Sequence, residues 1–417
     1  MDKKYKNREK FTEIIKYLDV PEVLVLHGSR QVGKTTLMKI AMEYLRNKEN
    51  NQVFYFDLEK SEYLELCNKG IEAIVSYIKA RQNSRQLENN TKSKIYIFID
   101  EIQYLDDPAS LIKLFYDHHK DDFKLLVSGS SSFAIKSKFK NSLVGRIIDL
   151  EIFGLSFHEF LDFKNLNYDL SSDSELIKKE LKNLYEEYVV YGFYPQVVLT
   201  DNIELKELYL RNIIEKYIYK DIKDLANIKD LKKFNNLLVF LASQVGQLIN
   251  TQELSNTLKL ARQTIEEYLF ILENTYIIKT VYPFHKNIRG ELTKMPKIYF
   301  EDTGILNILK NGKINSQIDG VLFENSSFNY LSRYFRVQNI HFWRTAAKQE
   351  IDFIINDNNK IIPIEVKLSY QEKMIKNLFY FGDKYKISSL YCLAYNQMSN
   401  GNEKVKQLYP WEVMKIV

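Results

Sequence analysis

The segment Gly28–Thr35, GSRQVGKT, constrains the fold of this chain more than any other. Two glycines enclose four residues and are followed by Lys34 and Thr35, which is the complete G-x-x-x-x-G-K-[ST] pattern of a phosphate-binding loop. The apolar run Leu24–Leu26 predicts a buried strand before the loop, and the residues after it predict a helix. The alternative, a glycine-rich turn with a surface lysine, does not explain this position between a strand and a helix.

The residue types of this loop suit a nucleoside triphosphate with a magnesium ion. Glycine permits the backbone conformations that bring consecutive N–H groups onto phosphate oxygens, beside the positive end of a helix. Lys34 supplies a charge for the β- and γ-phosphates, and Thr35 supplies a hydroxyl of the kind that Mg²⁺ prefers. The predicted cofactors are ATP and Mg²⁺. The predicted nucleotide-binding residues are Gly28, Ser29, Arg30, Gln31, Val32, Gly33, Lys34, Thr35 and Thr36.

Apolar runs and helical patterns alternate over the first third of the chain. Residues 53–58, 95–101 and 123–132 have the pattern of buried strands, whereas residues 35–46 and 61–80 have that of helices. This alternation predicts an α/β fold with a doubly wound parallel sheet.

Polar side chains follow two of these strands. Ligands of open α/β sheets bind at the carboxyl ends of the strands, where the loop, Asp100, Glu101 and Ser128 all fall. We expect Asp100 to be a Mg²⁺ ligand together with Thr35, and Glu101 to orient and deprotonate the attacking water. Ser128 is expected to contact the γ-phosphate. A carboxylate pair after a strand is otherwise more often a helix N-cap, but the complete phosphate loop favours catalysis.

Arg146 is a further catalytic candidate. It follows a basic stretch that contains Lys136, Lys138 and Lys140, and it lies near the last strand of the predicted domain. A guanidinium group there can reach the γ-phosphate of a neighbouring subunit, although an internal salt bridge would look the same in the sequence. The predicted catalytic residues are thus Glu101, Lys34, Arg146 and Ser128.

Composition narrows the class of protein. The 417 residues suffice for two or three domains, and no apolar run approaches the roughly 20 residues that cross a membrane. The charged N-terminus is not followed by the apolar core of a signal peptide, so we expect a cytoplasmic protein without a membrane partner. Cys67 and Cys392 are too few for a disulfide framework or a cysteine-based zinc site. A net charge of +5 is too small to indicate nucleic-acid binding by itself.

The chain resembles a family along nearly its whole length. The segments GSRQVGKT, FIDEIQ, SGSSS, LVGR and GLSFHEFL look like prokaryotic AAA+-type P-loop ATPases with a conserved, poorly characterised C-terminal region. The likeness continues through YGFYPQVV, YIYKDI, KIYFEDTGILNIL and EIDFII…PIEVK. The family usually has proline where Ser29 stands here. This resemblance implies ATP binding and hydrolysis, a winged-helix unit and a nuclease-like C-terminal fold.

The middle of the chain has the pattern of a winged helix. Residues 231–243 and 261–275 are helical, Thr251 suits the cap of a helix between them, and residues 276–284 suit a wing strand. The third helix would offer Arg262 and Gln263 to DNA, but Glu266 and Glu267 follow. Because two carboxylates would repel phosphates, packing against a domain or subunit is the favoured role of this helix.

The C-terminal region carries a second polar constellation. A turn at Asn358 and Asn359 between two alternating strands would place Asp352 opposite Glu365, with Cβ atoms roughly 4.5 to 5.5 Å apart. Lys367 shares their face. Such carboxylates repel unless one is protonated or a divalent cation lies between them.

This arrangement resembles the D…E-x-K site of restriction-endonuclease-like nucleases. Glu324 resembles the additional acidic residue of the Holliday-junction-resolvase branch. The predicted nuclease residues are Glu324, Asp352, Glu365 and Lys367, with Mg²⁺ or Mn²⁺ as the cofactor. The alternative is a surface charge cluster on an ordinary hairpin.

Two hypotheses about function follow. In the first, an AAA+-type ATPase couples ATP turnover to DNA through the nuclease-like domain. In the second, an ATP-dependent switch acts on a protein partner and the nuclease fold is inactive. Both allow a homo-oligomer through the ATPase domain. The predicted domains are an ATPase domain at 1–160, a helical linker with a winged helix at 161–315, and a restriction-endonuclease-like domain at 316–417.

Overall fold

The structure is a computed structural model that describes residues 5–48, 51–81, 94–129, 143–222, 228, 230–284, 295–358, 360–397 and 403–416. The chain divides into two compact units. Unit 1 comprises residues 1–154 with 274–276, and unit 2 comprises residues 155–273 with 277–417.

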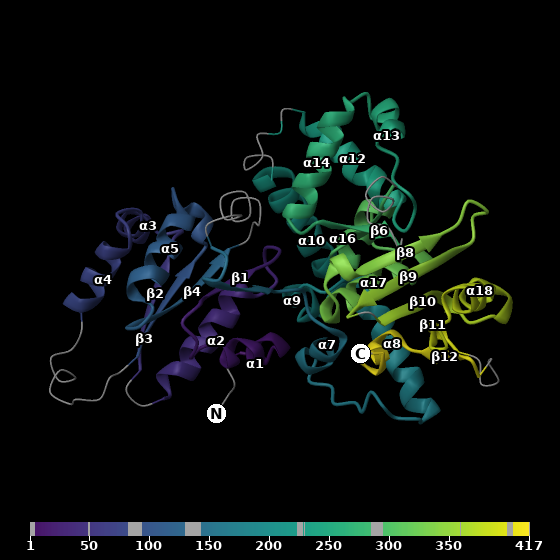
Figure 1. The fold of residues 1–417 in the computed structure, drawn as a ribbon, viewed down its shortest axis with the longest axis horizontal. Coiled ribbons are helices and arrows are strands. Elements are labelled where there is room, and N and C mark those ends of the chain that lie inside the picture. Colours follow the sequence, from purple (N-terminus) through teal and green to yellow (C-terminus); the bar gives the residue numbers. More distant parts are fainter. Residues whose placement is uncertain are drawn as a thin grey trace. The chain divides into compact units, whose positions relative to one another are not determined.

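Unit 1 contains a parallel five-stranded sheet of order β2-β3-β4-β1-β5, as the alternation of strands and helices predicted (Figure 1). Its strands are β1 (Val23–His27), β2 (Gln52–Asp57), β3 (Ile95–Asp100), β4 (Phe123–Gly129) and β5 (Ile147–Glu151). Its helices are α1 (Glu9–Lys16), α2 (Lys34–Arg46), α3 (Ser61–Asn68), α4 (Ile71–Ala80), η2 (Ile102–Tyr104) and α5 (Pro108–His119). The predicted helix over 61–80 is two helices, because Gly70 has a φ of 95° between them.

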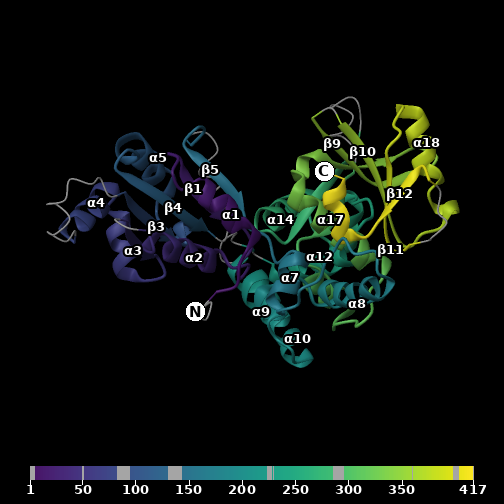
Figure 2. The same cartoon turned by 90° about the horizontal axis from the view of Figure 1, so that it is seen from below.

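The three central strands β1, β3 and β4 are buried on both faces, which explains their continuous apolar sequences, whereas the outer strands β2 and β5 are partly exposed. Alternate strand residues such as Val25, Ile97 and Val127 share a core with the apolar sides of α4 and α5. Their neighbours, such as Leu26 and Phe98, are equally buried on the other face, where α2 contacts β2 and β4. Helices therefore lie on both sides of the sheet (Figure 2).

Unit 2 begins with helices. They are α7 (Phe157–Phe163), α8 (Glu175–Tyr191), α9 (Pro195–Val198), α10 (Ile203–Asn212), the π-helix η3 (Ile213–Asp221), α12 (Leu231–Ser243), α13 (Thr251–Leu258) and α14 (Arg262–Asn274). The helices over 231–243 and 262–274 agree with the sequence. The cap of α13 does not, because the Asn250 side chain accepts hydrogen bonds from the N–H groups of Gln252 and Glu253, which makes Thr251 the first helical residue.

A mixed seven-stranded sheet of order β12-β11-β10-β9-β8-β6-β7 forms the rest of unit 2. Its strands are β6 (Ile278–Pro283), β7 (Lys297–Phe300), β8 (Ile340–Arg344), β9 (Glu350–Asp357), β10 (Lys360–Ser369), β11 (Leu390–Asn396) and β12 (Val405–Leu408). The accompanying helices are α16 (Thr303–Asn311), α17 (Gly320–Tyr334), η4 (Val337–Asn339), η5 (Glu372–Met374), α18 (Lys376–Tyr385) and η6 (Pro410–Lys415).

The predicted wing belongs to this sheet. β6 pairs antiparallel with β7 and parallel with β8, with Tyr282 opposite His341. At the outer strand β7, the buried side chains of Asn325 and Asn329 from α17 hydrogen-bond to the Phe300 backbone. The sheet therefore crosses the boundary that we predicted at 315/316, and residues on both sides of it form one compact unit.

Candidate functional site

The phosphate loop connects β1 to α2 as predicted. Gly28, Gln31 and Gly33 have φ angles of 146°, 64° and 100°, so the chain turns sharply between the strand and the helix. A Cβ atom on Gly28 would lie 2.2 Å from the carbonyl oxygen of Ile152, so only glycine fits there. Lys34 begins α2, with Thr35 half-buried and Thr36 exposed in its first turn.

Lys34 is 5% exposed and points back into the loop. Its Nζ donates hydrogen bonds to the carbonyl oxygens of Gly28 at 3.0 Å and Ser29 at 2.8 Å. Burial lowers the pKa of Lys34 to about 8, although the carboxylates of Glu101 and Asp100 act in the opposite direction. The three charged groups therefore belong to one site at the carboxyl edge of the sheet.

Asp100 ends β3 and is 3% exposed. Tyr55 of β2 donates its phenolic hydrogen to Oδ2 of Asp100 at 2.8 Å, and Ser128 of β4 donates its hydroxyl hydrogen to Oδ1. Ser128 also accepts the Glu101 N–H at 3.4 Å. Its single hydrogen is thus committed to Asp100 here, and the predicted contact with a γ-phosphate stays a prediction.

Glu101 has a left-handed backbone conformation, with φ 58° and ψ 47°. Such a conformation is uncommon for a residue with a side chain and occurs often at functional sites. Its Oε2 accepts a hydrogen bond from the Gln103 side chain. The predicted catalytic carboxylate therefore lies directly beyond the strand and is held by a neighbouring amide.

Arg8 was missed by sequence reasoning. It is 6% exposed, and its guanidinium donates to Val32 O at 2.7 Å and to Phe153 O at 2.9 Å. These bonds join the segment before α1 to the phosphate loop and to the segment after β5. The charged N-terminal sequence contains no signal that separates Arg8 from its basic neighbours.

Arg146 lies at the amino ends of the strands, whereas the phosphate loop lies at their carboxyl ends. Its carbonyl oxygen accepts the N–H of Val23 at the amino end of β1, whereas the loop follows the carboxyl end. Its guanidinium pairs with Asp117 of α5 at 2.8 Å, which is the internal salt bridge that we considered as the alternative. Arg146 thus cannot reach the loop of its own subunit, and a role in another subunit stays a prediction. Lys136, Lys138 and Lys140 lie outside the described residues.

The residues at the loop fit a nucleotide with Mg²⁺. The cradle has no room for a side chain at Gly28, and Lys34 is buried at its base. Thr35 and Asp100 offer hard oxygen atoms of the type that Mg²⁺ binds. These residues would hold the nucleotide and its metal ion at the carboxyl edge of the sheet.

The C-terminal hairpin has the predicted register. β9 and β10 pair with Asp357 opposite Lys360 and Phe353 opposite Ile364, which brings Asp352 and Glu365 together. Both are buried, with exposed fractions of 9% and 4%. Lys367 Nζ lies 3.2 Å from Asp352 Oδ2 and 2.7 Å from Glu365 Oε1. An ammonium group therefore contacts both carboxylates.

The protonation of this cluster follows from its burial. Burial and then the charge of Asp352 raise the pKa of Glu365 to about 8, as expected if one carboxyl group retains its proton. Burial would lower the pKa of Lys367, but the two carboxylates outweigh it and raise it. Lys367 and a protonated Glu365 together relieve the repulsion without a divalent cation.

Glu324 joins the same cluster from α17. Its Oε1 accepts a hydrogen bond from Tyr299 at 2.7 Å, and burial and Asp352 raise its pKa to about 7. Lys297, which is 1% exposed, lies 3.8 Å from Glu324 and 2.6 Å from Glu350. Among the described residues, no group of three or more His, Cys, Asp and Glu side chains is arranged to hold a metal ion.

The helix that we considered for DNA binding, and for which the sequence favoured packing, is α14. Arg262 forms an exposed ion pair with Glu266 at 2.8 Å, four residues along the helix. A carboxylate of its own helix thus neutralises this guanidinium. The packing role that the sequence favoured for this helix stays a prediction.

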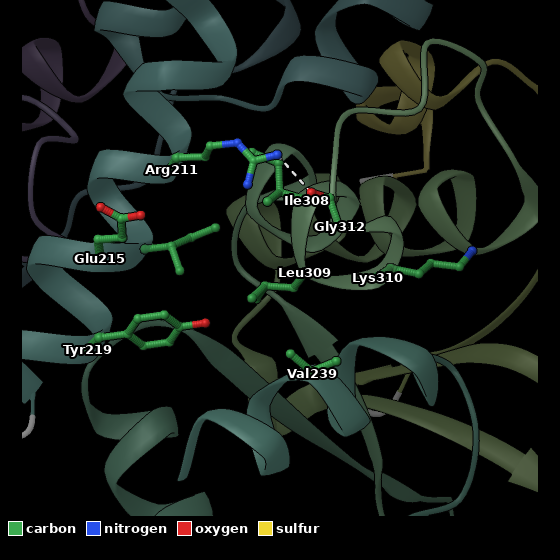
Figure 3. A pocket seen from close by; sticks show the side chains of 9 residues that line it. Arg211, Glu215, Tyr219, Val239, Ile308, Leu309, Lys310 and Gly312 are labelled. Carbon is green, nitrogen blue, oxygen red and sulfur yellow. Dashed lines mark hydrogen bonds between the residues drawn. The ribbon is translucent and has the colours of Figure 1, made fainter. Parts of the chain in front are cut away.

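A separate cavity of about 380 Å³ lies in unit 2, between the π-helix and the end of α16 (Figure 3). Apolar side chains, including Ile214 and Leu309, and the Tyr219 ring line it. Arg211 is held at its rim by hydrogen bonds to Glu207 and to Gly312 O. None of the residues that we predicted for a site lines this cavity.

Across the part of the chain that the structure describes, no helix is long and apolar enough to cross a membrane.

Comparison with protein families assigns three regions of the chain. Residues 20–161 match a family described as "AAA domain". Residues 182–316 match "Domain of unknown function (DUF8612)", and residues 319–413 match "Domain of unknown function (DUF4143)". The AAA match covers the phosphate loop, Asp100, Glu101, Ser128 and Arg146.

Related proteins occur in bacteria and archaea. An uncharacterized protein of Haemophilus influenzae is 29% identical over 425 residues, with 99% of each chain covered. An uncharacterized protein of Methanocaldococcus jannaschii is 25% identical over 86% of this chain and 79% of its own. The alignment with the Haemophilus influenzae protein therefore spans all three regions of this chain.

Among solved structures, Cdc6p from Pyrobaculum aerophilum has a TM-score of 0.31 and 13% identity, covering 74% of this chain and 96% of its own. Drosophila ORC bound to DNA has a TM-score of 0.30 and 12% identity, covering 70% and 91%. Structural similarity with TM-scores this low does not indicate a function for this chain. The family match and the parallel sheet with its phosphate loop support an AAA-type ATPase domain at residues 20–161, followed by two regions of unknown function.

Proposed function

We propose that the protein hydrolyses ATP in a Mg²⁺-dependent reaction at the carboxyl edge of the unit 1 sheet. The observation that carries this proposal is the buried Lys34 at the base of the phosphate loop. It lies close enough to Glu101 and Asp100 for their negative charges to act on its pKa. A cation and two carboxylates at the end of a glycine cradle are the groups that phosphoryl transfer to water requires.

Each residue has a separate task. Lys34 exchanges the carbonyl oxygens of Gly28 and Ser29 for phosphate oxygens when a nucleotide binds. Mg²⁺, when bound, neutralises phosphate charge, and Thr35 and Asp100 are its protein-side partners. Glu101 orients a water molecule and accepts its proton.

The test is ATP turnover and nucleotide binding by the full chain. We expect phosphate release with Mg²⁺, none with excess EDTA, and saturable ADP binding by calorimetry. If the wild-type protein binds neither ATP nor ADP, the proposal fails. If it binds both but releases no phosphate under any condition, the site is a nucleotide sensor.

For unit 2 we propose that ATP turnover is coupled to DNA engagement. The supporting observation is the convergence of Asp352, Glu365 and Lys367 on one face of the hairpin, the side-chain set of a D…E-x-K nuclease. In this restriction-endonuclease-like interpretation, Asp352 and Glu365 would hold a divalent cation, which would supply a Lewis acid for DNA cleavage, and Lys367 would have to move from its position between them.

A second candidate is an ATP-dependent switch that acts on a protein partner. Lys367 favours it, because its ammonium group already contacts Asp352 and Glu365, and Lys297 lies 3.8 Å from Glu324. The ion pair of Arg262 with Glu266 favours it as well, since it leaves α14 without an unpaired arginine at its start.

One pair of measurements separates the two. ATP turnover is measured with and without branched, single-stranded and duplex DNA, at about 50 and 200 mM salt because phosphate contacts weaken steeply over that range. The same DNAs are incubated with Mg²⁺ or Mn²⁺ to detect nicking. DNA coupling predicts stimulation that falls with salt, whereas the switch predicts neither stimulation nor nicking.

A further inference from the structure

The carboxylate of Asp100 is held on both sides by hydroxyl groups from the two neighbouring strands. Tyr55 Oη, on β2, lies 2.8 Å from Oδ2, and Ser128 Oγ, on β4, donates to Oδ1. Each oxygen therefore has its own donor. Because Asp100 is 3% exposed, few water molecules can replace these donors, and the plane of the carboxylate is fixed by the protein.

The sheet register explains how Tyr55 reaches Asp100. β2 and β3 are parallel, with Asp57 opposite Asp100, and Tyr55 lies two residues before Asp57 on the same face. The long phenol side chain spans this diagonal to the end of the neighbouring strand. Phe54 and Phe56, which alternate with Tyr55, pack into the core on the other face. The hydroxyl rather than the ring is therefore the part of Tyr55 directed at the site.

We propose that Tyr55 is a positioning residue that sets the affinity of the nucleotide site for its divalent cation through Asp100. This inference rests on the proposed ATPase function. A carboxylate that holds a metal ion, directly or through water, binds it best when its orientation is fixed in advance. Losing the phenolic donor lets the Asp100 carboxylate rotate, which weakens metal binding without touching the phosphate loop.

The experiment compares wild-type protein with Tyr55→Phe, which keeps the ring and removes the hydroxyl. Mn²⁺ binding in the presence of ATPγS is measured by electron paramagnetic resonance, and ATPγS binding in EDTA is measured by calorimetry. We expect Mn²⁺ to bind about tenfold more weakly, as for other groups that orient metal ligands. The affinity for ATPγS without metal should be unchanged.

Two further variants show whether the effect passes through Asp100. Tyr96→Phe removes a buried hydroxyl near the amino end of β3, where the ring lies beside Lys94 and far from Asp100, and should leave Mn²⁺ affinity unchanged. In an Asp100→Ala background, Tyr55→Phe should cause no additional loss, because the side-chain acceptor of the phenol is absent there.

The outcomes are distinct. The inference is overturned if Tyr55→Phe binds Mn²⁺ like the wild type, if the loss persists in the Asp100→Ala background, or if metal-free ATPγS binding falls equally. That last result would indicate a general structural role. If wild-type protein binds no ATPγS, the proposed ATPase function fails first. If wild type binds Mn²⁺ with ATPγS and only the Tyr55 effect is absent, the ATPase proposal stands.

Discussion

Lys34 and Glu101 lie at one site, and the proposed reaction assigns them different roles. We expect Lys34→Ala to lose tight ATP binding, because the loop loses its buried cation. We expect Glu101→Gln to bind ATP normally and to hydrolyse it at least about a hundredfold more slowly, since the base is lost while the shape remains. Binding is measured by calorimetry and turnover by phosphate release. Turnover of Glu101→Gln at the wild-type rate would rule out Glu101 as the base.

The lowered pKa of Lys34 links nucleotide binding to protons. Below about pH 8 the free protein carries the ammonium ion, whereas above it the amine is neutral. Phosphate oxygens stabilise the charged form, so ATP binding above about pH 8 should take up a proton, and affinity should fall as pH rises further. Calorimetry in two buffers with different ionisation enthalpies measures this uptake. Equal apparent enthalpies at pH 8.5 would contradict it.

At the scale of residues, the sequence allowed prediction of those site residues that belong to short contiguous motifs. The loop from Gly28 to Thr35 and the pair Asp100–Glu101 follow directly from short motifs that bind phosphate and metal in a fixed strand–loop–helix context. Arg8 and Tyr55 were not predictable, because their partners Phe153 and Asp100 are distant in sequence and meet only when the sheet forms.

At the scale of elements, the β9–β10 hairpin also combines a local feature that could be predicted with a long-range contact that could not. A two-residue turn fixes the register of the strands, so Asp352 opposite Glu365 could be predicted, and Asn358 takes the left-handed conformation that such turns favour. The approach of Lys297 could not be predicted, because this residue arrives from β7, on the far side of β8 and β6 in the sheet.

The hairpin makes stability depend on pH. The pKa of Glu365 is raised to about 8 in the folded protein, against an unfolded value near 4.5. Between these values the folded state retains a proton that the unfolded state releases. The free energy of unfolding should therefore decrease as pH rises from about 4.5 to about 8. In Glu365→Gln, which cannot ionise, the decrease should be smaller.

Denaturant unfolding at several pH values between 5 and 8 measures the slope for each protein. Glu372→Gln, which alters an exposed glutamate in η5, serves as the matched control and should keep the wild-type slope. Glu324 contributes in the same direction, since its pKa is raised to about 7, so some slope should remain in Glu365→Gln. Identical slopes for wild type and Glu365→Gln would contradict this account.

At the scale of the whole molecule, Arg146 bears on assembly. It lies at the edge of the sheet opposite its own phosphate loop, so any γ-phosphate that it contacts belongs to another subunit. We expect Arg146→Ala and Lys34→Ala proteins to be inactive separately and to regain part of the ATPase activity when mixed. Each mixed interface can then combine an intact loop with an intact arginine.

Phosphate release from a titration of the two variants measures this rescue. Arg81→Ala removes a surface arginine beside Tyr77 at the end of α4 and should behave as wild type. A fully active monomer in sedimentation measurements would exclude a role of Arg146 between subunits, and the ion pair with Asp117 would then be its whole role.

The organisation of unit 2 could be predicted only in part. Alternation within β9 and β10 and the helical pattern of α12 and α14 are local, and both agree with the structure. The parallel pairing of β6 with β8 joins residues nearly 60 positions apart and leaves no mark in either strand. The boundary that we predicted at 315/316 lies at the junction of two family matches, 182–316 and 319–413, and the seven-stranded sheet extends across it.

That continuity has a consequence for inheritance. A gene fragment that begins after residue 315 would encode β8 without its neighbour β6, and would leave the backbone groups of β8 at His341 and Phe342 open to pairing with another chain. Such a fragment should self-associate rather than travel between proteins as an independent module. The second region of unknown function is thus expected to need β6, which belongs to the first, in order to remain a monomer.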